Sequence, residues 1–195
     1  QHKALTQNTE ALQMQFQEIH RSAEQAVRRT ETIAASERHA RQEAFMRIAD
    51  QVKRQLGGIS GLLYISSQGS AGNGKIPDDE MARYWSELNR GDTEVFSRLM
   101  LMAHLGLDDE DEPVGLFYGT EIRARHSNNF IYTFERLRQR AQEADSDGML
   151  EDAIAGSAHG FLYRLAIKYR QRAPAELASA DITGRDNIRT MPSMP

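Results

Sequence analysis

The first 56 residues contain neither glycine nor proline, and this run constrains the fold more than any other feature of the sequence. Glycine and proline are the residues that most strongly interrupt a helix. The run is also four to five times as long as an average globular helix of about 12 residues. We therefore predict one continuous helix over residues 1–56, about 80 Å long at a rise of about 1.5 Å per residue. Pairs such as Glu24 and Arg28, with the acidic residue four positions before the basic one, further stabilise such a helix.

Apolar residues recur along this predicted helix at alternating steps of four and three residues. Of the twelve positions reached in this way from residue 5 to residue 44, nine are apolar, and we call these nine residues the seam: Leu5, Leu12, Phe16, Ile19, Ala23, Ala26, Ile33, Ala40 and Ala44. This spacing is the heptad pattern of coiled coils. An isolated apolar stripe would be left in water, so it must be covered either by the chain's own domain or by another copy. We expect a homo-oligomer that forms through residues 5–44, because a helix of about 80 Å is longer than a domain with a radius of gyration of about 13 Å.

The rest of the chain predicts shorter helices. Gly57 and Gly58 should stop or loosen the long helix, and residues 62–65 favour a helical turn over a strand because no second strand is available for pairing. Helices are expected from Asp78 or Asp79 to about residue 88, from Asp92 to about residue 107, and over residues 114–144 and 149–172. The predicted fold is all-α: a long N-terminal coiled-coil-like helix (1–56), a compact helical bundle (57–172) and a flexible tail (173–195).

Composition and motifs argue against most catalytic and metal-binding classes. The chain has no cysteine, which excludes disulfides, thiolate metal sites and cysteine catalysis. Its net charge of −4 argues against a nucleic-acid-binding protein. No GxSxG or HExxH motif occurs, and no two of the six histidines stand three or four residues apart. We expect a protein that is not an enzyme, with no catalytic residue, metal or cofactor.

Gly69, Gly74 and Lys75 match the first part of a phosphate-binding loop. Such a loop needs a hydroxyl residue next, to hold a magnesium ion, and a helix whose first amides face the phosphates. The next residues are Ile76 and Pro77. Residues 69–75 are therefore more simply interpreted as a flexible connector, with nucleotide binding as the alternative.

The residues 143–151 partly match a calcium-binding EF-hand loop, with acidic residues at Glu143, Asp145 and Asp147 and a glycine at Gly148. Calcium binding also needs a bidentate acidic residue at the twelfth position, and Ile154 stands there. An ordinary helix-capping turn is the plainer interpretation. Calcium binding is the alternative.

Basic residues form two groups near the C-terminal ends of predicted helices: Arg136, Arg138 and Arg140, and then Arg164, Lys168, Arg170 and Arg172. Cations at helix C-termini are stabilised by the helix dipole, so solvated helix ends are the plain interpretation. Contact with anionic lipid headgroups or with an acidic partner is the sharper alternative.

The amphipathic helix followed by the segments DDEMARYWSELNRGD and FYGTEIRARHSNNFIYTFERLRQRA resembles, over residues 10–172, uncharacterised bacterial membrane-anchored proteins. In these proteins a membrane helix leads into an amphipathic helix and a small helical domain. The resemblance implies a membrane anchor before Gln1, and we favour the cytoplasmic face of a bacterial membrane as the location. It implies no activity and no catalytic residues.

The sequence thus predicts a non-enzymatic oligomerising scaffold or signalling adaptor. The alternative is a ligand-sensing or metal-sensing helical domain, with residues 143–151 or 69–75 as its site.

Overall fold

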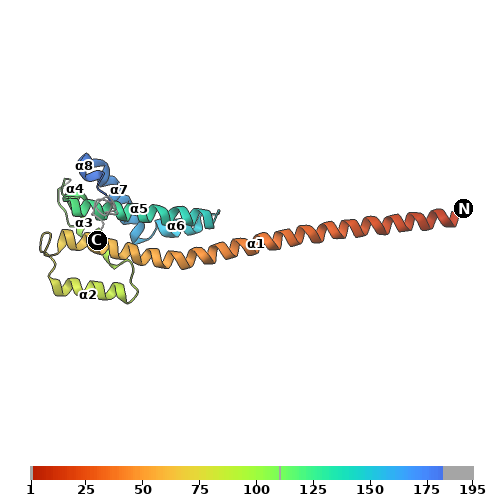
Figure 1. The fold of residues 1–195 in the computed structure, drawn as a ribbon, viewed down its shortest axis with the longest axis horizontal. Helices are drawn as coiled ribbons and strands as arrows, with labels where there is room; N and C mark the ends of the chain where they lie inside the picture. The colour runs from red at the N-terminus through yellow and green to blue at the C-terminus, as the bar shows by residue number, and fades with distance from the viewer. Residues whose placement is uncertain (1, 110, 182–195) are drawn as a thin grey trace, which may run out of the picture. The chain divides into compact units, whose positions relative to one another are not determined.

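The computed structural model describes residues 2–109 and 111–181, and its secondary structure in that part of the chain is entirely helical (Figure 1). The described helices are α1 (His2–Gln68), α2 (Asp78–Asn89), α3 (Val95–Leu105), α4 (Glu112–Tyr118), α5 (Glu121–Ala144), α6 (Met149–Ala155), α7 (Ala158–Arg172) and α8 (Ala175–Ala178). The prediction of an all-α fold, with a long N-terminal helix followed by a helical bundle, is confirmed.

Helix α1 ends at Gln68 instead of near residue 56, because it continues through the glycines that were expected to interrupt it. A Cβ atom on Gly57 would lie 2.5 Å from the carbonyl oxygen of Thr93, and one on Gly61 would lie 2.8 Å from the ring of Trp85. These glycines therefore allow the neighbouring segments to pack closely against α1. The apolar surface buried there offsets the cost of about 1 kcal/mol for each helical glycine. Residues 62–65 are helical, as predicted.

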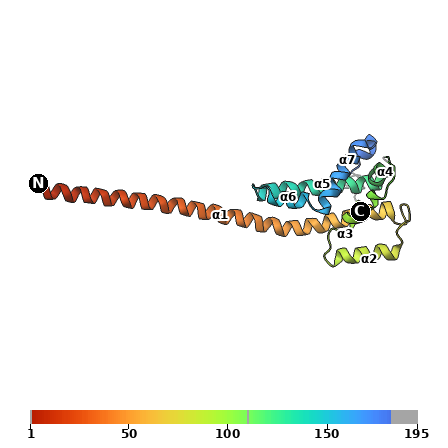
Figure 2. The ribbon, with the colours of Figure 1, turned by 180° about the vertical axis from the view of Figure 1, so that it is seen from behind.

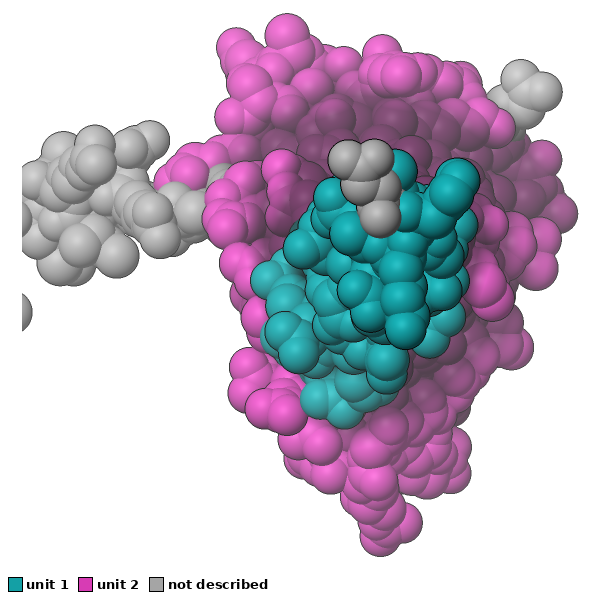
Figure 3. Space-filling model, turned by 90° about the vertical axis from the view of Figure 1, so that its right-hand side faces the viewer, with its two compact units in different colours: residues 1–44 teal, residues 45–195 magenta. Residues whose placement is uncertain are grey.

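The chain divides into two compact units, Gln1–Ala44 and Phe45–Pro195, which are coloured separately in Figure 3. The boundary lies inside α1, before the predicted boundary at residue 56. If the seam continued past Ala44, its next positions would be Arg47 and Gln51, and both are exposed. The buried residues of α1 instead begin one position after Ala44 and include Phe45, Ala49, Leu56, Ile59 and Leu63. The apolar spacing thus changes register where the second unit begins.

Two helices predicted as continuous are each divided. The prediction of one helix over residues 114–144 is wrong, because the side chain of Thr120 accepts a hydrogen bond from the backbone N–H of Arg123 and caps a new helix, α5. The prediction of one helix over residues 149–172 is wrong for the same reason, since Ser157 accepts from the N–H of Gly160 and caps α7. A glycine precedes each cap residue, and glycine is a poor helix former.

An aromatic cluster lies within the unit Phe45–Pro195. The ring of Phe96 is fully buried, and its centroid lies between 4.8 and 6.3 Å from those of Tyr64, Tyr84 and Trp85. Figures 1 and 2 agree that α2 lies on one side of the C-terminal part of α1 and that α4 and α5 lie on the other. The C-terminal part of α1 is therefore the central element of this unit.

Helix α8 belongs to the segment predicted as a flexible tail. The side-chain amide of Asn128 donates hydrogen bonds to the carbonyls of Ala178 and Ala180, each 3.0 Å long. The hydroxyl of Tyr118 donates to the other end of the same side chain, over 2.7 Å. Residues 173–181 therefore differ from the prediction, because partly buried hydrogen bonds attach Ala178 and Ala180 to Asn128 of α5. The rest of the predicted tail, residues 182–195, lies outside the described residues.

Candidate functional site

The nine seam residues all lie on α1 within the unit Gln1–Ala44, and all are exposed. The five large ones expose between 51% and 73% of their surface: Leu5, Leu12, Phe16, Ile19 and Ile33. Burial of such a side chain is worth about 1.5–3 kcal/mol. The seam is therefore an exposed apolar stripe in the described part of the chain.

The positions that flank the seam carry little charge. In heptad notation these are the e and g positions, which between residues 6 and 36 are Thr6, Gln13, His20, Val27, Ala34, Asn8, Gln15, Ser22, Arg29 and Ser36. With histidine taken as neutral, Arg29 is the one charged residue among these ten, and the next two flanking positions, Arg41 and Glu43, have opposite charges. Residues 1–44 as a whole contain six acidic and six basic side chains. Because charges at e and g select partners in coiled coils, this seam places little electrostatic restriction on its partner.

Two histidines of α1 each contact the carboxylate that lies four residues later in the sequence. The Nε2 atom of His20 lies 3.5 Å from the carboxylate of Glu24, and that of His39 lies 3.2 Å from the carboxylate of Glu43, with all four side chains largely exposed. In residues 2–109 and 111–181, no three or more His, Asp or Glu side chains are grouped so that they could hold a metal ion.

His104 is half-buried at the end of α3 and forms a hydrogen bond with the hydroxyl of Tyr169, 2.6 Å from its Nε2 atom. Burial lowers the pKa of its ring, and the positive charge of Lys168 acts in the same direction. His104 is therefore a hydrogen-bonded residue at the rim of the core.

The loop of residues 69–75 uses its backbone amides within the chain. The N–H groups of Gly72 and Gly74 both donate to the carbonyl of Gly69, over 2.9 Å, and that of Asn73 donates to the carbonyl of Ser67. The N–H of Lys75 donates to the side chain of Asn73. A phosphate-binding loop needs such amides free to face the phosphates. This loop conformation therefore does not provide a phosphate site.

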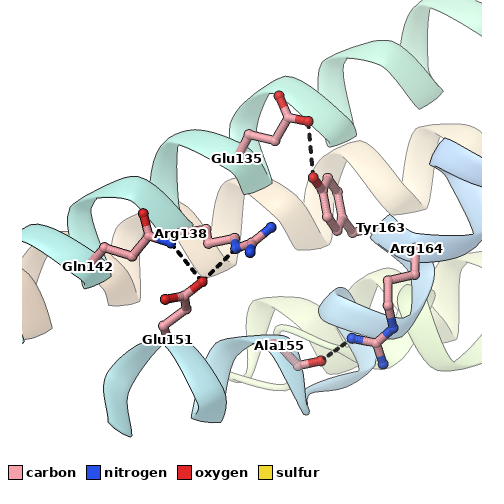
Figure 4. Close-up of polar contacts among 7 residues, drawn as sticks. All are labelled: Glu135, Arg138, Gln142, Glu151, Ala155, Tyr163 and Arg164. Carbon is pink, nitrogen blue, oxygen red and sulfur yellow. Dashed lines mark hydrogen bonds and ion pairs between the residues drawn. The ribbon is translucent and has the colours of Figure 1, made fainter. Parts of the chain in front are cut away.

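The turn of residues 143–151 has the hydrogen bonds of a capping turn. The carboxylate of Asp145 accepts from the N–H groups of Asp147 and Leu150, over 3.1 and 3.3 Å. Figure 4 shows that Glu151 points toward α5, where it accepts from Arg138 and Gln142, over 2.7 and 2.8 Å. The Arg138 contact lowers the pKa of Glu151. The carboxylates of Asp145 and Glu151 therefore bond to groups of their own chain, and no three possible metal ligands are grouped together in the described residues.

Neither of the two basic groups presents all its charges to solvent. Arg138 pairs with Glu151, and the guanidinium of Arg136 donates to the hydroxyl of Tyr132 over 2.9 Å. Figure 4 shows Arg164 bonded to the backbone carbonyl of Ala155, at 2.7 Å. Arg172 lies 3.4 Å from a carboxylate oxygen of Asp111. These contacts favour solvated helix ends over a shared anion-binding surface, and the acidic or lipid partner stays a prediction.

No sequence motif indicates the buried pair that Ser97 on α3 forms with His159 on α7. The Ser97 Oγ atom lies 2.5 Å from Nδ1 of His159, and both residues are buried. Burial lowers the pKa of His159 to about 4, and the charges of Lys53 and Arg98 act in the same direction, against the backbone carbonyls that face the ring. The two partners are 62 residues apart, so no short motif could have revealed the pair.

Comparison of the chain with protein-family models, with curated proteins and with solved structures finds no match. The resemblance to bacterial membrane-anchored proteins therefore stays a prediction. None of the described helices combines the length and the apolar character needed to cross a membrane. The predicted anchor would precede Gln1 and is not tested by this observation.

Proposed function

We propose that this protein is a self-associating scaffold in which a second copy of the chain covers the seam. The observation that carries the proposal is the exposure of more than half of each large seam side chain. Helices in proteins are stabilised mainly by the packing of an apolar face and only weakly by their own propensity. Association of two or more copies would supply this packing to residues 5–44.

Charge supports a second copy as the partner. Two identical surfaces with a high charge of one sign would repel each other, whereas the flanks of this seam carry little charge and residues 1–44 have equal numbers of acidic and basic side chains. Close approach of identical helices therefore meets little repulsion.

Side-chain size along the seam indicates where association is strongest. Large residues occupy the seam from Leu5 to Ile19, and alanines occupy most of it beyond Ala23. Alanine allows helices to approach closely but buries less area at each position. The free energy of association should therefore come mainly from residues 5–19, with a further contribution from Ile33.

Sedimentation velocity of the full chain over a range of concentrations tests this proposal. Ile19→Asp should raise the dissociation constant at least tenfold, because it places a charge in the apolar contact. Met14→Asp is a matched control, since Met14 and Ile19 are each 66% exposed on the same helix and Met14 lies outside the seam. It should leave the oligomer within twofold of the wild type.

A wild-type chain that sediments as a monomer at all concentrations would overturn the proposal. Equal weakening by the two substitutions would also count against it, because it would show that any apolar surface of this helix serves equally well.

A further inference from the structure

A cavity of about 130 Å³ lies inside the unit Phe45–Pro195, between the C-terminal part of α1 and the helices α5, α6 and α7. Nine of its thirteen lining residues are apolar, and they include Phe45, Leu56, Phe134, Leu137 and Ile154. An apolar cavity of about 150 Å³ in another protein is known to bind benzene. The size and walls of this cavity therefore suit a molecule built around six or so carbon atoms.

Two side chains of opposite charge also line the cavity, Lys53 and Glu94. Within the described residues, neither side chain forms a hydrogen bond or an ion pair. A ligand of either charge would be attracted by one of them and repelled by the other. The wall therefore favours an occupant without net charge.

The buried ring of His159 provides a polar group in the wall that lacks a partner. The Ser97 hydroxyl forms a hydrogen bond with Nδ1 of His159. Because this hydroxyl has no other acceptor among the described residues, it is the donor in this bond. This arrangement leaves the ring proton on Nε2. Nε2 itself has no hydrogen-bond partner in the described structure. A buried donor without an acceptor is unfavourable, and a ligand acceptor would relieve it.

From this combination we infer that the cavity is a binding site for a small, largely apolar and uncharged molecule that carries one hydrogen-bond acceptor, such as a hydroxyl or carbonyl group. The apolar body fills the space between α1, α5 and α6, and the acceptor faces the ring of His159. Such a site would give the bundle a ligand-binding role that is separate from self-association through the seam.

Benzyl alcohol is a suitable probe, with toluene, benzoate and benzylamine as comparators that lack the acceptor or carry one charge. Binding to the full chain is measured by NMR titration, with the unfolding temperature as a second readout. We expect benzyl alcohol to bind at least fivefold more tightly than benzoate or benzylamine. It should also bind more tightly than toluene, because toluene leaves Nε2 unpaired.

A substitution that fills part of the cavity tests whether benzyl alcohol binds there. Ala153 lines the cavity from α6 and is itself exposed, so Ala153→Leu should fill part of the space without disturbing the core. It should weaken benzyl alcohol binding at least tenfold. Ala82→Leu is the control, because Ala82 is exposed on α2 and does not line the cavity. It should change the affinity less than twofold.

His159→Phe tests the acceptor, since it keeps an aromatic ring and removes both nitrogens. It should abolish the preference for benzyl alcohol over toluene. If it does not fold, the Ala153→Leu result still decides whether the cavity is the site. The inference is overturned if the wild type binds no probe at millimolar concentrations, or if Ala153→Leu binds benzyl alcohol like the wild type. Equal binding of benzoate would overturn the uncharged class of ligand.

Discussion

Phe16 and Phe45 lie on the same helix, yet Phe16 is 73% exposed and Phe45 is 5% exposed. Both belong to apolar stripes with the same alternation of four and three residues, one in each compact unit. The helical period is therefore equally clear in the two units, but it does not decide whether a stripe becomes a core. In the second unit other helices cover the stripe. In the first unit the stripe stays available for a partner.

The two units also differ in charge. Residues 1–44 are balanced, whereas residues 45–195 hold 22 acidic and 18 basic side chains and therefore the whole net charge of −4. The excess negative charge thus belongs to the bundle, and the seam lies in a part of the chain without net charge. The absence of net charge on residues 1–44 is consistent with the proposed self-association through the seam.

The largest expected effect compares one phenylalanine from each unit. Phe96→Ala removes a fully buried ring that contacts three other aromatic rings, and it should lower the free energy of unfolding of the bundle by about 3–5 kcal/mol. Phe16→Ala removes an exposed ring and should change this quantity by less than about 0.5 kcal/mol. Denaturant unfolding followed by tryptophan fluorescence measures both, because the single Trp85 lies beside Phe96.

In sedimentation velocity, Phe16→Ala should weaken self-association more than Phe96→Ala does, because Phe16 belongs to the seam and Phe96 does not. A large loss of bundle stability in Phe16→Ala would contradict the division of roles between the units.

A smaller effect is expected from pH, and it should arise in the bundle. The pKa of His159 is lowered by burial to about 4, below the value of about 6.5 in an unfolded chain. The unfolded state therefore binds more protons between these values, so the stability falls as the pH is lowered from about 6.5 toward 4. The neutral ring of His159 contributes on the order of 3 kcal/mol to the free energy of unfolding above pH 6.5, relative to the value below pH 4.

Burial also lowers the pKa values of His104 and His126, which adds to the slope in the same direction. His159→Gln measures the contribution of this one histidine. It should reduce the change in unfolding free energy between pH 6.5 and 4 by the contribution given above for His159, on the order of 3 kcal/mol. An unchanged slope would show that His159 does not hold a neutral ring in the folded bundle.

The smallest effects concern two glycines of α1, and they test how closely the bundle packs on this helix. A Cβ atom at Gly61 would lie within 3 Å of the rings of Trp85 and Phe96, so Gly61→Ala should destabilise the bundle by about 1–3 kcal/mol. A Cβ atom at Gly58 would meet nothing within 4 Å, so Gly58→Ala should stabilise it by about 0.5–1 kcal/mol. Thermal unfolding of the two variants should shift in opposite directions, and shifts of the same sign would show that helix propensity alone governs both positions.

The helices and most of their starts could be predicted because their signals are local. The absence of glycine and proline before residue 57 and the four-and-three spacing act within a few residues along the chain. The divisions at Thr120 and Ser157 were missed although both residue types are good N-caps. The apolar spacing continues across both residues and therefore favoured single helices. In the structure, the hydrogen bond that each cap residue accepts instead begins a new helix.

By itself, the sequence determined that the chain is helical, that its first part is one long helix, and that this helix carries an apolar stripe from Leu5 to Ala44. Only the tertiary structure decided that α1 continues to Gln68, that burial begins at Phe45, and that Ser97 meets His159 beside a cavity. The physical reason is that helix formation depends on neighbours three or four residues apart, whereas burial and buried hydrogen bonds depend on residues that are brought together from distant parts of the chain.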